Sequence, residues 1–289
     1  MASPKEIRKR IRSVRNISQI TRAMEMVAAS KMRRAQQRVL ASRPYAEHLE
    51  LMIGDLAAVQ MDAEDLSAFP LLTKREIKRT AVILITPDRG LTGPLNSNII
   101  RRAARYITAE SDGKPVEVIS VGKKGRDFMI RTGQTVTSSY TGFGDQVAMA
   151  ELRPVVQAAI GDFVDGKVDA VHVVYARFVN TLTQVPDVRQ ILPIVQPASG
   201  GAYTDYIFEP SPQVVLESLL PRYVEVQVYQ AMLDSIASEH SARMVAMHSA
   251  SDNAKELGQD LTLSLNKARQ AQITREVSEI AAGAEALKK

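Results

Sequence analysis

Residues 3–30 read SPKEIRKRIRSVRNISQITRAMEMVAAS, and the periodicity of this stretch is the clearest structural signal in the chain. Ser3, Pro4 and Glu6 make a helix start, because serine caps the first turn, proline suits the first helical position and glutamate completes a capping box. Apolar side chains then recur in steps of three and four residues, at Ile7, Ile11, Val14, Ile17, Ile20, Met24 and Val27. This spacing is typical of a coiled-coil seam, so we expect a long helix that packs lengthwise on another helix.

A second stretch of the same kind ends the chain. Residues 212–289 begin with a proline in a helix-start position and continue with a seam at Tyr229, Leu233, Ile236, His240, Arg243, Met247, Ala250, Ala254, Leu257 and Leu261. A further apolar series follows at Ile273, Val277, Ile280, Ala284 and Leu287. We expect this helix to be antiparallel to the first and longer by roughly 20 residues, so that residues 268–287 form an unpaired tip. Proline is expected to perturb the first helix at Arg43-Pro44 and to kink the last at Pro221.

The residues between the two helices predict an α/β domain. Apolar, β-branched runs suit buried strands over 80–86, 116–121, 168–175 and 183–193, and helices are expected over 96–110, after Gly122, and over 147–164. This alternation predicts a doubly wound, mainly parallel, Rossmann-like sheet. The expected organisation is therefore an N-terminal coiled-coil helix (1–60), a linker (61–79), the α/β domain (80–195), a loop (196–211) and a C-terminal coiled-coil helix with its tip (212–289).

Positive charge is concentrated in the first helix. The whole chain has a formal net charge of +5, yet residues 1–43 contain twelve basic and only two acidic side chains. The basic residues are Lys5, Arg8, Lys9, Arg10, Arg12, Arg15, Arg22, Lys31, Arg33, Arg34, Arg38 and Arg43. Such a cationic helix favours an anionic partner, which from charge alone is a nucleic acid, a phospholipid surface or an acidic protein surface.

The composition limits the chemistry that the chain can perform. Cysteine is absent, which excludes a disulfide framework, a thiolate nucleophile and a cysteine metal site. The four histidines show no metal-ligand spacing, and no catalytic triad or carboxylate pair stands out. No apolar run approaches the roughly 20 residues needed to span a bilayer, and the first residues lack an apolar signal core. We therefore expect no catalytic site, no metal, no cofactor and no transmembrane segment.

Two glycine-containing turns have the composition of phosphate-binding loops. Asp88-Arg-Gly-Leu-Thr-Gly93 follows the first predicted strand, and Gly122-Lys-Lys-Gly125 follows the second. Neither contains the Gly-Lys-Ser/Thr of a P-loop or the Gly-x-Gly-x-x-Gly of a dinucleotide fold. An ordinary strand-to-helix turn is the favoured interpretation of both, which disfavours a nucleotide-dependent enzyme in the middle domain.

Several longer motifs resemble the gamma subunit of F-type ATP synthases. The resemblance is carried by Ile20-Thr-Arg-Ala-Met-Glu-Met-Val-Ala-Ala-Ser-Lys-Met32 and Asn266-Lys-Ala-Arg-Gln-Ala-Gln-Ile-Thr-Arg-Glu-Val-Ser-Glu-Ile280, with Asp88–Asn96, Phe178–Gln184 and Glu209–Pro212 between them. It covers essentially the whole chain in the same order. Thr92 and Pro94 depart from the cysteine and glycine frequent in the family, which leaves the local backbone of that turn open.

The resemblance implies a rotor without a catalytic site of its own. In the family, the coiled coil stands inside a hexamer of alpha and beta subunits, whose interfaces hold the nucleotide sites. The α/β domain lies with the epsilon subunit on a ring of c subunits, at the cytoplasmic face of the bacterial cell membrane. Proton flow turns this assembly and drives ATP synthesis. The residues implied in contact with beta subunits are Met24, Lys31, Arg33, Arg34, Arg269, Gln270, Thr274 and Glu276.

The main alternative is a nucleic-acid-binding coiled coil with an α/β head. It would use the same cationic helix to contact phosphates, with binding that falls steeply as salt increases. The first helix, however, has no aromatic side chain before Tyr45 on which a base could stack, and its methionine- and alanine-rich seam suits protein partners. Nucleic acid is therefore not the expected partner.

Overall fold

The computed structural model describes residues 3–58, 69–195, 209 and 211–286. Its contacts divide the chain into two compact units. We call Met1–Ala28 with Met244–Lys289 the coil unit, and Ala29–Arg243 the head unit. Two long helices, α1 (Pro4–Ala58) and α6 (Pro212–Ala286), contribute to both units. The predicted loop over 196–211 and the first half of the predicted linker lie largely outside the described residues.

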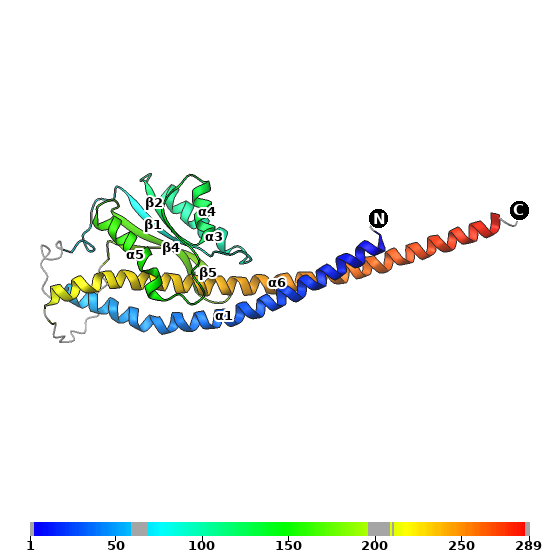
Figure 1. The fold of residues 1–289 in the computed structure, drawn as a ribbon, viewed down its shortest axis with the longest axis horizontal. Helices are drawn as coiled ribbons and strands as arrows, with labels where there is room; N and C mark the ends of the chain where they lie inside the picture. The colour runs from blue at the N-terminus through cyan, green and yellow to red at the C-terminus, as the bar shows by residue number, and fades with distance from the viewer. Residues whose placement is uncertain (1–2, 59–68, 196–208, 210, 287–289) are drawn as a thin grey trace. The chain divides into compact units, whose positions relative to one another are not determined.

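The head unit contains a five-stranded sheet in the order β3-β2-β1-β4-β5 (Figure 1). Its strands are β1 (Thr80–Ile85), β2 (Val116–Val121), β3 (Thr135–Tyr140), β4 (Ala170–Phe178) and β5 (Gln184–Leu192). The first four are parallel, and β5 pairs antiparallel with β4. The predicted fold class, a mainly parallel α/β sheet with long terminal helices, is confirmed.

Alternate side chains of the central strand β1 serve two different cores. Ala81, Ile83 and Ile85 pack into a core with α5 (Met149–Val164), α1 and α6. Val82 and Leu84 pack on the opposite face with α3 (Leu95–Arg105) and α4 (Lys123–Arg131). Figure 1 shows α3 and α4 on one side of the sheet and the long helices on the other. The sheet is buried on both faces, which explains why β1 is apolar at nearly every position.

The sequence-based prediction missed one strand and differs in detail from the observed helices. The sequence indicated no strand over Thr135–Tyr140, which forms β3 at the edge of the sheet. Its residues are polar and only partly buried, so it lacks the apolar run that marks a central strand. In addition, α1 continues through Pro44 and α6 through Pro221 without a break. The helix predicted over 96–110 is divided into α3 and a π-helical turn, η1 (Tyr106–Glu110).

The α1 seam follows a stricter rule than the sequence-based assignment. Its buried or half-buried positions alternate steps of four and three from Ile7 to Leu56, which is the 3.5-residue repeat of a coiled coil. In the coil unit this seam runs through Ile7, Ile11, Val14, Ser18, Thr21, Glu25 and Ala28. The predicted seam instead contains consecutive steps of three residues at Ile17 and Ile20. From Ile17 onward its residues therefore lie on a different face of the helix. Those two residues, with Met24 and Val27, are exposed.

The coil unit is an antiparallel helix pair. Glu25 Oε1 lies 2.9 Å from His248 Nδ1, and the Ser251 hydroxyl donates to the Ser18 carbonyl at 3.5 Å, so the pairing runs backward along α6. The α6 seam consists of Met247, Ser251, Ala254, Gly258, Leu261, Leu265 and Ala268. Two predicted seam positions, Ala250 and Leu257, were wrong by one residue, because the seam contains Ser251 and Gly258 instead. Small residues at this seam bring the two helices close together.

Candidate functional site

The turn after β1 is organised by one carboxylate. Asp88 Oδ1 accepts a hydrogen bond from the Lys123 amide at 2.9 Å, and its Oδ2 accepts one from the Gly142 amide at 2.8 Å. These amides follow β2 and β3, so Asp88 connects three loops at the carboxyl edge of the parallel strands. This edge is where α/β proteins commonly bind ligands.

The amides at the start of α4, which could otherwise bind a phosphate, donate to groups of the protein itself. The first amides of α4 donate to Asp88, to the Pro87 carbonyl at 3.3 Å and to the Thr86 hydroxyl at 2.8 Å. A Cβ atom at Gly122 would lie 1.8 Å from the Thr86 carbonyl oxygen, so glycine here serves close packing. Because the first amide donors of α4 are already satisfied within the protein, the Gly122-Lys-Lys-Gly125 turn does not offer them to a phosphate. The interpretation of an ordinary turn fits this geometry.

The coil unit leaves apolar surface uncovered on α1. Ile17, Ile20, Met24 and Val27 lie three or four residues apart, on one face of the helix, and each is between 40% and 55% exposed. We call these four residues the α1 stripe. The neighbouring positions Arg15 and Arg22 are also exposed. An apolar stripe flanked by cations is a surface for another protein with apolar and acidic groups.

The end of α6 is uncovered on all sides. From Arg269 to Ala282 every side chain is exposed, including Ile273, Val277 and Ile280, which are between 53% and 72% exposed. These exposed side chains lie in the segment that the sequence predicts to be an unpaired tip; Leu287 of that segment lies outside the described residues. Arg269, Gln270, Thr274 and Glu276 are all on this exposed segment, and Glu276 accepts a hydrogen bond from Gln272 at 2.8 Å.

The remaining predicted contact residues have different surroundings. Arg33 and Arg34 are exposed on α1. Lys31 is not free, because its Nζ lies 2.6 Å from Asp145 Oδ2. Burial raises the pKa of the Asp145 carboxyl, but Lys31 and His240 outweigh that effect and lower it below the ordinary value. Asp145 also lies 3.0 Å from His240. One sign of this cluster was visible in the sequence, namely the polar residues His240 and Arg243 in an otherwise apolar predicted seam.

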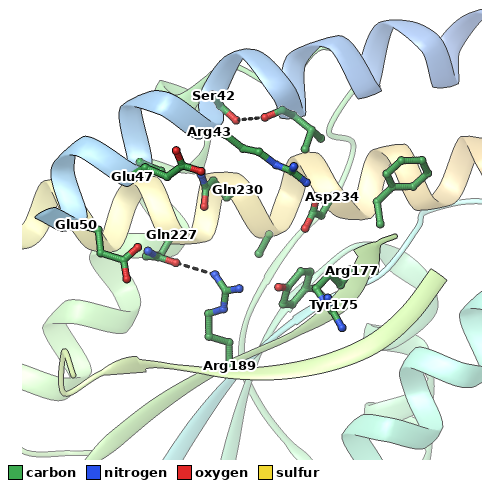
Figure 2. Close-up of a pocket in the computed structure, with 14 residues that line it drawn as sticks. Ser42, Arg43, Glu47, Glu50, Tyr175, Arg177, Arg189, Gln227, Gln230 and Asp234 are labelled. Carbon is green, nitrogen blue, oxygen red and sulfur yellow. Dashed lines mark hydrogen bonds between the residues drawn. The ribbon is translucent and has the colours of Figure 1, made fainter. Parts of the chain in front are cut away.

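A polar cavity of about 330 Å³ lies between α1, α6 and strands β4 and β5. Figure 2 shows Arg43 of α1 directed toward Asp234 of α6, with Tyr175 and Arg189 beside them. Arg189 donates to Gln227 at 3.0 Å. Burial raises the pKa of Asp234 to about 6, against the opposing effect of Arg43 and Arg189. None of these residues was predicted as a group, because they come from four separate elements.

In the part of the chain that the structure describes, no group of three or more metal-ligating side chains is placed to hold an ion. Among the same residues, no helix is both long enough and apolar enough to cross a bilayer.

These features define a class of protein. A cationic coiled coil with exposed apolar stripes, attached to an α/β sheet whose phosphate-type turn is filled from within, belongs to a component that acts through protein contacts. A family model described as ATP synthase matches residues 3–287. The ATP synthase gamma chain of Roseiflexus castenholzii is 54% identical over 291 residues, which cover 99% of each chain. The chain belongs to the ATP synthase gamma chain family.

Solved structures agree with this assignment. The central stalk and c-ring structure of the Tetrahymena thermophila mitochondrial ATP synthase contains a chain that matches 80% of this one and 99% of its own length, with 27% identity and a TM-score of 0.58. A chain of the Euglena gracilis mitochondrial ATP synthase matches 98% of this chain and 94% of its own length, with a TM-score of 0.69. At 20% identity the second match supports the fold alone. Family membership decides against the nucleic-acid alternative.

Proposed function

We propose that this chain is the central rotor shaft of an F-type ATP synthase, which couples proton flow through the membrane sector to ATP synthesis and hydrolysis at alpha/beta interfaces. The observation that carries the proposal is full-length membership of the gamma chain family together with the two exposed apolar segments, the α1 stripe and the end of α6. A contiguous exposed apolar surface of this kind marks a site where a partner binds. The chain has no catalytic site of its own in this proposal.

The partners in this proposal are a hexamer of alpha and beta subunits around the coil, and the epsilon subunit with the c-ring beside the α/β domain. The related structures support this set in part, since they contain F1, the central stalk and the c-ring of mitochondrial ATP synthases. The location in this proposal is the cytoplasmic face of the bacterial membrane, where the chain is bound peripherally. Contacts with beta subunits are assigned to Met24, Lys31, Arg33 and Arg34 on α1 and to Arg269, Gln270, Thr274 and Glu276 on α6.

Arg33 and Arg34 provide the sharpest test of these contacts, because both are exposed, whereas Lys31 is already paired with Asp145. The double variant R33Q/R34Q should retain assembly with alpha and beta chains but pump fewer protons per ATP hydrolysed in membrane vesicles. The matched control is R101Q/R105Q, which neutralises two arginines on α3 of the head unit.

Two results would contradict the proposal. If the unmodified chain, expressed with its operon partners, did not co-purify with alpha and beta chains, the rotor function would be wrong. If R33Q/R34Q assembled and pumped as many protons per ATP as the unmodified complex, the rotor would stand, but these two arginines would have no part in coupling.

A further inference from the structure

One side chain of the head unit contacts both long helices. Asp145 lies in the loop over residues 141–148, between β3 and α5. Its Oδ2 atom is 2.6 Å from Lys31 Nζ of α1, and its Oδ1 atom is 3.0 Å from His240 Nε2 of α6. A single carboxylate therefore joins three parts of the head unit that are far apart in the sequence.

The contacts continue from His240 to a second loop. Arg243 Nη1 is 3.5 Å from His240 Nδ1, and Arg243 Nη2 is 2.6 Å from Glu239 Oε1. The same Nη2 atom donates to the Gly90 carbonyl at 3.4 Å. Gly90 belongs to the turn after β1, so α6 is attached through polar side chains to two different loops of the α/β domain.

The loop that presents Asp145 is anchored on both sides of it. The Gly142 amide donates to Asp88 at 2.8 Å, and Phe143 packs against the main core. On the other side Val147 is buried, and Glu151 accepts a hydrogen bond from the Ala148 amide at 2.9 Å. Because the segment is held on both sides of Asp145, this side chain has a defined position relative to the core of the head unit.

The energetic role of this cluster is specificity rather than stability. Asp145 is 45% exposed and Lys31 is 35% exposed, and an ion pair at such a surface contributes little to folding. His240 is different, because it is 2% exposed and occupies a coiled-coil seam position where an apolar side chain would pack better. Its Nε2 atom has no well-directed hydrogen bond among the described residues, and burial lowers its pKa against the opposing effect of Asp145 and Glu239. Polar residues at seam positions fix the register of helices at a cost in stability.

We propose that Asp145, with Lys31 and His240, is a positioning residue for torque transmission: it holds the loop over 141–148 against α1 and α6 at one register, so that the α/β domain and the two helices turn together without slip. We call this set of three residues the Asp145 clamp. The inference rests on the rotor function proposed above and adds to it the residues that connect the α/β domain to the shaft.

The test uses the assembled ATP synthase with three variants of this chain. Asp145→Asn removes the charge but keeps the size, and Asp145→Glu restores the charge. His240→Leu removes the contact of Asp145 to α6, together with the 3.5 Å contact of His240 to Arg243, and leaves Lys31 paired with Asp145. The control is Glu110→Gln, which breaks the bidentate Arg102–Glu110 pair of α3 and η1, at 2.8 and 3.0 Å, in a place away from the helices' seam.

Three quantities are measured for each variant: hydrogen exchange of the amides of residues 143–146, protons pumped per ATP, and the thermal midpoint of the isolated chain. For Asp145→Asn and His240→Leu, amide exchange in the loop should rise about tenfold, as for the loss of one ordinary polar contact, and protons pumped per ATP should fall. The thermal midpoint should stay nearly constant for Asp145→Asn, because an exposed ion pair contributes little to folding, and it should not fall for His240→Leu, because an apolar side chain packs better at this seam position. Asp145→Glu should recover most of the pumping, and Glu110→Gln should change none of the three quantities.

The outcomes separate the clamp from the rotor function. Faster loop exchange with unchanged pumping, in a complex that assembles, would overturn the clamp and leave the rotor intact. Loss of pumping in Asp145→Asn but not in His240→Leu would also overturn it, since a freed Lys31 would then be the cause. Failure of the unmodified chain to assemble with alpha and beta chains would instead refute the rotor function on which the inference rests.

Discussion

At the level of single residues, Asp234 has a pKa well above the ordinary value of a carboxyl group. It lines the polar cavity between α1, α6 and the sheet, and burial raises its pKa to about 6 from 3.8. Between these two values the folded chain keeps the proton and the unfolded chain loses it. The stabilisation from this group is therefore complete below the unfolded pKa and is lost as the pH rises through about 6. Above that pH a charged carboxylate remains in a site that disfavours it.

The variant Asp234→Asn should raise the free energy of unfolding at pH 7.5 by about 1–2 kcal/mol, because the amide resembles the neutral acid and carries no charge to desolvate. At pH 4 the two proteins should be nearly equal in stability. Urea unfolding at both pH values measures the difference. Asp112→Asn is the matched control, since the Asp112 side chain is 80% exposed and its replacement should give a small effect at either pH. Destabilisation by Asp234→Asn at pH 7.5 would show that its charge is needed in the cavity.

At the scale of the elements, two glycines in helices should respond in opposite ways to the same substitution. A Cβ atom at Gly258 of α6 would meet the Val14 side chain at 3.9 Å, an ordinary contact. A Cβ atom at Gly125 of α4 would lie 2.9 Å from side-chain atoms of Leu84 and Thr86. Gly258→Ala should therefore stabilise the coil unit by about 1 kcal/mol, through the higher helix propensity of alanine.

Gly125→Ala should destabilise the head unit by about 1–3 kcal/mol, the usual cost of forcing a methyl group into a packed interior. Helical circular dichroism during thermal unfolding measures both changes, and each variant serves as the control for the other. Equal shifts in the same direction would mean that close packing of α4 on β1 does not decide the effect.

Some helices and strands could be predicted from the sequence and others could not. β1 and β2 were predicted to within one residue, because strands buried on both faces need continuous apolar runs. β3 was missed because it lies at the sheet edge and is polar. The seam of the coil unit was misassigned from Ile17 onward, because apolarity alone identified its positions. Strict alternation of three and four residues would have selected Ser18, Thr21 and Glu25, which are polar or small but lie at the helix interface.

At the scale of the whole molecule, the candidate surfaces were easier to anticipate than the individual contacts. The unequal distribution of charge and the excess length of the last helix indicated a chain that needs partners, and both follow from counting residues. The Asp145 clamp and the cavity around Asp234 were not predictable in this way. Each brings together side chains from three or four elements, and only the three-dimensional arrangement of the sheet and helices makes them neighbours.

The end of α6 provides the last prediction. An isolated helical segment with no buried side chain is marginal in water, so residues 269–282 should unfold locally and often in the free chain. Their amides should exchange with solvent much faster than those of residues 229–240, which lie in a largely buried part of the same helix. In the assembled complex the difference should largely disappear if the alpha/beta hexamer covers Ile273, Val277 and Ile280, as the proposed rotor function requires.

Hydrogen exchange followed by mass spectrometry, on the free chain and on the complex, measures this directly. The triple variant I273S/V277S/I280S should leave exchange in the free chain unchanged, since these side chains are already exposed there, and should reduce protection in the complex. The matched control is K255S, which replaces a side chain on the exposed surface of the paired part of α6 and should alter neither state. If residues 269–282 were already protected in the free chain, the apolar side chains of this segment would have a partner within the chain itself, and the expectation that the hexamer supplies it would be wrong.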